Sequence, residues 1–152
     1  MTIAWIYLDK RTATVDALKD YNTMEHLIQN FCNGLDEIQS KMTSLSSTSI
    51  VKASKNTNPK SGEARLVASI SEIDILKERH QRALEYMKWF QPAWDVLTED
   101  ERFILSEFYR NEGSKQIDSI ATICDRFHIE RSSAYNKKNR ALDKLALLLY
   151  GR

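Results

Sequence analysis

The chain has 152 residues, of which 42% are hydrophobic, and its formal net charge at pH 7 is +1. This length allows the core of one modest domain or of two small ones. Only four glycines and two prolines are present, and this scarcity favours long helices over a turn-rich β fold. We therefore expect an all-α protein. No stretch has the length of a membrane span, and the apolar start Met1–Leu8 is too short for a signal peptide.

The amino-terminal half predicts helices that alternate with polar breaks. Apolar residues at spacings near three and four predict an amphipathic helix from Thr12 to about Asn30. Asn33-Gly34 predicts a break before a short helix over Leu35–Met42. From Thr43 to Gly62 the residues are mostly Ser, Thr, Asn and Lys. Because such a composition buries little apolar surface, it predicts a flexible loop over residues 43–62.

The longest periodic segment is Glu63–Phe90, which carries apolar residues at helical spacing with charges between them. This pattern predicts a long helix that docks on another surface, either within the chain or across a dimer. Pro92 is expected to interrupt this helix. Residues 1–95 show no catalytic motif, and we expect them to form a helical domain for self-association or for contact with a partner.

Residues 96–152 predict a helix-turn-helix domain built of three helices. Thr98 has the residue type of an N-cap, and Glu101 stands at the capping-box position three residues later. Turn-forming residues separate the segments that follow. The predicted elements are a helix from Thr98 to Arg110, a break at Asn111–Ser114, a helix over Gln116–Phe127, a turn at His128–Glu130 and a third helix from Arg131.

Charge is distributed unevenly over this domain. Residues 95–125 contain eight acidic and three basic residues, a net charge of −5, whereas residues 126–152 contain seven basic and two acidic residues, a net charge of +5. The third helix is therefore a basic strip beside an acidic neighbour. Such a strip is where contact with the phosphates of a nucleic acid is expected.

Three stretches of the domain resemble the fourth conserved region of the main class of bacterial sigma factors. They are Leu97-Thr98 with Glu101-Arg102-Phe103-Ile104-Leu105, then Ile120-Ala121, then Arg140-Ala141-Leu142-Asp143-Lys144-Leu145. Together with the segments Ala4–Lys10 and Tyr86–Phe90, the whole chain is similar to the ArpU/RinA group of transcriptional regulators. These are small proteins of phages and prophages of Gram-positive bacteria that are implicated in switching on late genes.

The resemblance implies that the third helix lies in the major groove of DNA and that Arg131, Ser132 and Asn136 face the bases. Arginine pairs well with guanine, and asparagine with adenine. Tyr135 lies beside them and could contact a thymine methyl group or a phosphate. The alternative interpretation is that Arg131 and Ser132 only cap and solvate a helix start. The predicted phosphate contacts are Ser133, Lys137, Lys138, Asn139, Arg140 and Lys144.

One departure from the sigma pattern concerns the packing of the third helix. Lys137 stands where those domains usually have a branched apolar residue, and Ala134 stands where they often have valine. From these two positions we expect the third helix to pack less tightly on the second near its start.

The sequence therefore predicts a sequence-specific DNA-binding transcriptional regulator, encoded by a phage or prophage and acting in the cytoplasm of a bacterial host. Its expected partners are double-stranded DNA, a second copy in a homodimer and, as a candidate, host RNA polymerase. We expect no cofactor, no metal, no membrane contact and no enzymatic activity. Two alternatives are a sigma-like subunit of RNA polymerase and a DNA-recognition subunit similar to a small terminase.

Overall fold

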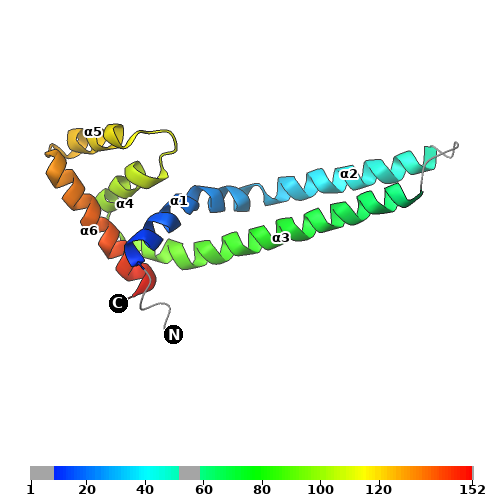
Figure 1. Ribbon diagram of the computed structural model, residues 1–152, viewed down its shortest axis with the longest axis horizontal. Helices are drawn as coiled ribbons and strands as arrows, with labels where there is room; N and C mark the ends of the chain where they lie inside the picture. Colours follow the sequence, from blue (N-terminus) through cyan, green and yellow to red (C-terminus); the bar gives the residue numbers. More distant parts are fainter. Residues whose placement is uncertain (1–8, 52–58, 152) are drawn as a thin grey trace. The chain divides into compact units, whose positions relative to one another are not determined.

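The computed structural model describes residues 9–51 and 59–151, and every regular element within these ranges is a helix (Figure 1). The predicted all-α fold is confirmed. No helix in this part of the chain is both long enough and apolar enough to cross a membrane. In chain order the elements are α1 Lys10–Gln29, α2 Phe31–Val51, α3 Pro59–Val96, α4 Glu99–Leu105, the π-helical turn η2 Ser106–Arg110, α5 Gln116–Phe127 and α6 Arg131–Tyr150.

The described residues form two compact units. Unit 1 combines residues 9–24 with residues 86–151, and unit 2 covers Glu25–Glu85. Helices α1 and α3 therefore each contribute one end to either unit. This division differs from the predicted boundary between residues 95 and 96. The reason is that the start of α1 and the end of α3 supply apolar side chains to the same core as α6.

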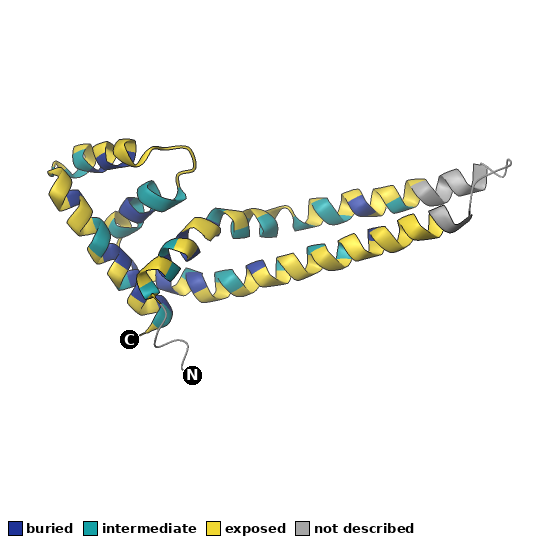
Figure 2. Ribbon diagram, viewed as in Figure 1, coloured by how far each residue is buried: buried dark blue, intermediate teal, exposed yellow. Residues whose placement is uncertain are grey.

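The core of unit 1 is built from one face each of α1, α3 and α6. Leu18, Phe90 and Leu145 have no exposed surface, and Figure 2 shows buried stretches on each of these three helices. The Phe90 ring lies between Tyr86 and Trp94, at centroid distances of 5.3 and 5.8 Å. The buried members of this core are Ala17, Leu18, Tyr21, Phe90, Ala93, Trp94, Leu97, Leu105, Ala141, Leu142, Leu145 and Leu149.

Polar contacts join α1 to its neighbours in unit 1. The Tyr86 hydroxyl donates a hydrogen bond to the carbonyl oxygen of Ala17. Burial raises the pKa of Tyr86, so the hydroxyl remains a donor at neutral pH. At the end of η2, the Arg110 guanidinium lies 3.7 Å from the centroid of the Tyr21 ring. Asn22 Nδ2 also donates to the carbonyl oxygen of Arg110 at 2.7 Å. Helix α1 is therefore fastened to both α3 and η2.

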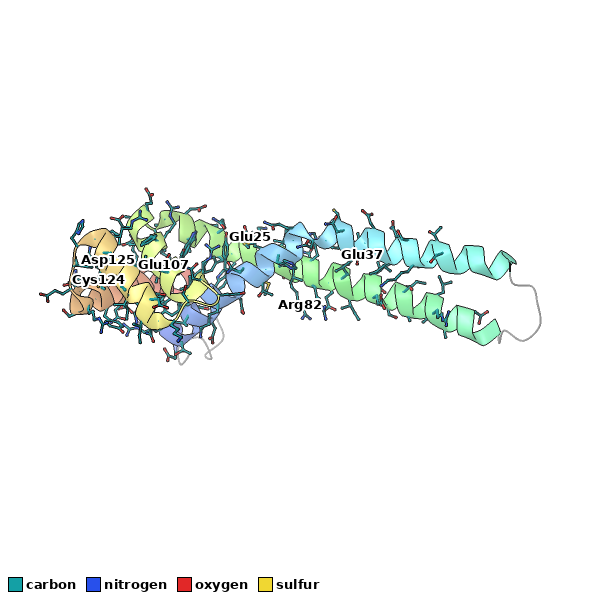
Figure 3. All side chains as sticks on the ribbon, turned by 90° about the horizontal axis from the view of Figure 1, so that it is seen from above. Glu25, Glu37, Arg82, Glu107, Cys124 and Asp125 are labelled. Atoms are coloured by element: carbon teal, nitrogen blue, oxygen red, sulfur yellow. The ribbon has the colours of Figure 1, made fainter. Side chains whose placement is uncertain are left out.

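Unit 2 contains α2 and the first part of α3, which lie side by side (Figures 1 and 3). The rings of Phe31 and His80 stack at a centroid distance of 3.9 Å. The break predicted at Asn33-Gly34 is wrong, because both residues lie inside α2. A Cβ atom on Gly34 would lie 3.1 Å from Cδ2 of Leu76. Glycine at this position therefore serves close helix packing, and the burial gained offsets its poor helix propensity.

The loop predicted over residues 43–62 is wrong for most of its length. Helix α2 continues to Val51, and α3 begins at Pro59; residues 52–58 lie outside the described part. Serine, threonine and asparagine have a helix propensity that is only modestly lower than that of alanine. Adding residues to an existing helix is also far easier than starting a new one, so a polar composition alone does not end α2.

The interruption predicted at Pro92 is also wrong, because α3 runs through this residue to Val96. A proline inside a helix costs about 3 kcal/mol, since it removes one hydrogen bond and crowds the preceding turn. Pro92 itself is exposed, whereas Phe90, Ala93 and Trp94 around it are buried. Burial of these side chains in the core of unit 1 outweighs the cost.

Candidate nucleic-acid interface

The turn between α5 and α6 sets the direction in which α6 leaves the domain. Helix α5 ends at Phe127, and the next residue, His128, has a left-handed backbone (φ 52°, ψ 48°) and donates its N–H to the carbonyl oxygen of Cys124. Glu130 is extended, and its carbonyl oxygen accepts the first helical hydrogen bond of α6 from Ala134 at 3.0 Å. The bounds predicted for α5, for this turn and for the start of α6 are confirmed.

A small second core holds α4, α5 and α6 together. Its buried members are Ile104, Ile123 and Ala134, one from each helix. The Ala134 side chain is fully buried, and the Lys137 ammonium lies 5.7 Å from the centroid of the Phe127 ring. The looser packing expected near the start of α6 is therefore not observed. Alanine is small enough to bring α6 close to α5, and the lysine covers an aromatic ring instead of facing an apolar pocket.

A second contact fixes α5 on η2. The buried Ser119 hydroxyl donates to the carbonyl oxygen of Glu107 at 2.8 Å. Glu107 lies in the π-helical turn, where Asn111 N–H bonds to the carbonyl oxygen of Ser106. Figure 3 labels Glu107 on η2 and both Cys124 and Asp125 on α5. Helix α5, on which α6 packs, is thus held on η2 by a buried hydrogen bond as well as by apolar contact.

The two faces of α6 differ sharply. Residues three or four apart share a face of a helix, and one face of α6 carries Ala134, Ala141, Leu142 and Leu145, all of which are buried. The opposite side is open to solvent. The predicted contact residues that are exposed there or at the helix start are Arg131, Ser132, Ser133, Asn136, Lys137 and Arg140.

Tyr135 and Lys138 lie at the edge of this exposed face. The Tyr135 ring is 36% exposed and lies 6.1 Å, between centroids, from Phe108. The Lys138 ammonium lies 5.2 Å from the centroid of the Phe108 ring and 5.3 Å from that of Tyr135. Partial burial, followed by the charge of Arg11, lowers the pKa of Lys138. Lys138 and its neighbour Asn139 are half-buried, so both present less surface to a ligand than Arg140 does.

Lys144, another predicted phosphate contact, forms an ion pair within the protein. Its ammonium lies 2.9 Å from Oε2 of Glu101. The same carboxylate accepts a hydrogen bond from the Thr98 N–H at 2.9 Å, and the Thr98 hydroxyl accepts one from the Glu101 N–H. The predicted capping box is therefore confirmed, and Lys144 connects it to α6.

Sequence reasoning missed the basic start of α1 as a neighbour of α6. Arg11 Nε and Nη2 donate to Oδ1 of Asp143 at 3.0 and 2.6 Å, and Nη2 also donates to Oδ2 at 2.9 Å. The two residues are 132 positions apart. No local pattern could have indicated this pair, because it depends on how α1 packs in unit 1.

Replacing Thr98 by alanine is expected to lower the free energy of unfolding by about 1 kcal/mol, because the first turn of α4 loses its side-chain cap. The measurement is urea unfolding followed by circular dichroism. Thr122→Ala is the matched control, since the exposed Thr122 hydroxyl only bonds within α5. An equal loss in both variants would contradict a capping role for Thr98.

The Glu101 carboxylate also predicts a pH dependence. Its partial burial raises its pKa, but hydrogen bonds from Lys144 and from the Thr98 N–H lower it more, so the net pKa lies below the ordinary value of 4.5. A carboxylate whose pKa is lowered by folding stabilises the protein at pH values above its ordinary pKa. This contribution is lost as the pH falls through the lowered pKa of the folded state. The stability difference between wild type and Glu101→Gln should therefore shrink below pH 4.5. A difference that stays constant over this range would contradict the assignment.

Within the described residues, no three potential metal ligands come together. Comparison of the chain with models of protein families, with curated proteins and with solved structures finds no match.

Proposed function

We propose that this protein is a sequence-specific transcriptional regulator that binds double-stranded DNA by inserting α6 into the major groove. The observation that carries the proposal is the asymmetry of α6. One face is buried against α4, α5 and the unit 1 core, while Ser132 and Asn136 are exposed on the other side and Arg131 is exposed at the helix start. A helix held in this way after a short turn has the geometry with which helix-turn-helix proteins reach base edges.

The residue types on this side suit base recognition. Arg131 can donate two hydrogen bonds to guanine, and Asn136 can exchange two with adenine. Ser132 can donate to or accept from a base, and the exposed edge of Tyr135 can pack against a thymine methyl group. Ser133, Lys137 and Arg140 lie close to these residues on exposed surface, so they are suited to contact phosphates on either side of the groove.

A photo-crosslinking experiment tests where DNA lies on the protein. A photo-reactive amino acid replaces Ser132 on α6 or, as the control, Ser40 on α2, since both serines are exposed. The probe is a duplex selected by the wild-type protein from a random-sequence library. We expect base crosslinks from position 132 and none from position 40. Crosslinks only from position 40, or selection without an enriched motif, would overturn the proposal.

We also propose that the protein binds DNA as a homodimer that associates through unit 2. A single recognition helix covers only a few base pairs, so two copies are needed for useful affinity. Apolar side chains near the start of the described part of α3 support this proposal. Leu66, Val67 and Ile70 are 45%, 62% and 47% exposed, which is unusual for a surface without a partner.

The dimer can be tested by sedimentation of the purified protein. We expect a mass of two chains for the wild type and of one chain for the double variant Val67→Lys and Ile70→Lys, because two buried charges would disfavour the interface. The matched control replaces Gln81 and Glu85, which are exposed on the same helix, by lysine. A monomeric wild type, or a double variant that still dimerises, would contradict this proposal.

The biological setting follows from the sequence resemblance. We propose a phage or prophage origin and a role in activating late genes, with host RNA polymerase as the partner. The exposed acidic residues at the start of α4, Glu99 and Asp100, offer a surface for such a partner outside the DNA-facing side of α6.

A further inference from the structure

Asp143 is an unexpected residue on a helix face proposed to meet DNA. It follows Ser132 and Asn136 along the same side of α6, at spacings of four and seven residues that return to one face. A carboxylate on this face repels phosphates unless another group offsets its charge. In the structure Arg11 occupies both of its oxygens through three hydrogen bonds.

The Arg11–Asp143 pair is built at the surface rather than in the core. The side chains of Arg11 and Asp143 are 54% and 57% exposed. An ion pair so exposed contributes little to folding, typically about 0–1 kcal/mol. Stability therefore gives only a weak reason for the pair, whereas the pairing fixes the guanidinium in one orientation beside α6. Its Nη1 group makes no hydrogen bond to any described residue, so that edge of the fork is open to a ligand.

The start of α1 holds Arg11 in this place. Asp9 Oδ1 accepts hydrogen bonds from the Arg11 and Thr12 N–H groups at 3.2 and 3.3 Å, which caps the helix at its first turn. A surface hollow of about 420 Å³ adjoins the pair and is lined in part by Lys10, Arg11 and Leu147. The positive charge of Arg11 also repels the Lys138 ammonium and, after burial, contributes to the lowered pKa of that lysine. Arg11 therefore adds a basic side chain from α1 beside the basic strip of α6.

Distances along α6 indicate which part of the DNA lies near Arg11 when α6 is in the groove. Asp143 lies seven positions after Asn136, a rise of about 10 Å along the helix axis. The major groove is about 8.5 Å deep. When the first turns of α6 enter the groove obliquely with Asn136 at the bases, Asp143 and Arg11 lie near the level of the phosphates at the rim.

We propose that Arg11 of α1 contacts a DNA phosphate at the rim of the groove and that Asp143 is the positioning residue that orients it. The proposal rests on the proposed function, since it requires α6 to bind DNA. It makes α1 part of the DNA-binding surface, a role that the sequence did not indicate. Arginine suits this role because its fork can bond a carboxylate with one edge and a phosphate with the other.

The test compares wild type with Arg11→Ala on two fluorescent duplexes, one selected by the wild-type protein and one of random sequence, over a series of salt concentrations. We expect similar fold losses of affinity on both duplexes and a decrease of about one in the slope of log K against log salt. Lys19→Ala, an exposed lysine on the same helix, is the control and should change neither quantity. Circular dichroism checks that each variant is folded.

The double variant Arg11→Ala with Asp143→Asn separates contact from simple charge cancellation. We expect it to keep the reduced salt slope, because the phosphate contact is still missing. Recovery of wild-type affinity and salt slope in the double variant would overturn the proposed phosphate contact. A wild-type salt slope for Arg11→Ala, or an equal loss of affinity for Lys19→Ala, would also overturn it. If the wild type binds neither duplex, the proposed function fails. If it binds both and only the Arg11 result is negative, the failure is confined to this inference.

Discussion

Replacing Phe90 by alanine is expected to lower the free energy of unfolding by about 3–5 kcal/mol, the usual cost of removing a fully buried aromatic ring. Phe90 has no exposed surface and packs against Tyr86 and Trp94 in the core of unit 1. The loss is so large because the cavity lies among helices that cannot close around it without moving α1 or α6. Urea unfolding followed by tryptophan fluorescence measures the change.

Trp89→Ala is the control for Phe90→Ala. Trp89 precedes Phe90 in α3 and is 38% exposed. Its ring contacts the Tyr150 ring at a centroid distance of 5.5 Å. Its replacement removes a larger side chain from a less buried place, so the expected loss is smaller. Losses of equal size in the two variants would contradict the full burial of Phe90 in the core of unit 1.

The same core explains why the units differ from the boundary expected at residue 95. Leu142 and Leu145 of α6 are covered by side chains from α1 and from the end of α3. A domain that began at residue 96 would leave this apolar surface of α6 open to water. Hydropathy along the chain shows that these helices each have an apolar face but does not show which faces meet.

The bounds of the helices after residue 98 could be predicted closely because their signals are local. Thr98 and Glu101 mark the start of α4, and the break after Arg110 and the turn at His128 separate the next helices. Each of these features depends on a few neighbouring residues. Cap chemistry and turn chemistry act over that range, so the sequence alone contains the information.

The features that could not be predicted depend on contacts distant in the chain. Gly34 stays helical because Leu76 packs against it, and Pro92 stays helical because the residues around it are buried. The Arg11–Asp143 pair joins two helices from opposite ends of the chain. In each case the local residue type favours one outcome and tertiary packing imposes another.

The second large effect concerns recognition. Arg131→Ala and Asn136→Ala are each expected to weaken binding to the selected duplex by about 1–3 kcal/mol, because each removes a side chain proposed to form a pair of hydrogen bonds with a base. Both side chains are exposed on α6, so these changes should leave the fold intact. Binding to random duplex should weaken far less, since that binding rests on phosphates.

Controls of the same residue types lie on unit 2. Arg79→Ala and Asn33→Ala remove an exposed arginine and an exposed asparagine from helices α3 and α2. Neither position is proposed to contact DNA, so affinity for both duplexes should stay at the wild-type value. These controls separate the loss of a base contact from the general effect of a changed net charge or a changed surface.

The most direct measurement of the central claim is the ratio of affinities for selected and random duplex, determined at one salt concentration for wild type and for the variant with both Arg131→Ala and Asn136→Ala. Base recognition by α6 predicts a high ratio for the wild type that falls steeply towards one in the variant. A ratio that stays unchanged while both affinities fall together would contradict it, because α6 would then touch only the phosphate backbone.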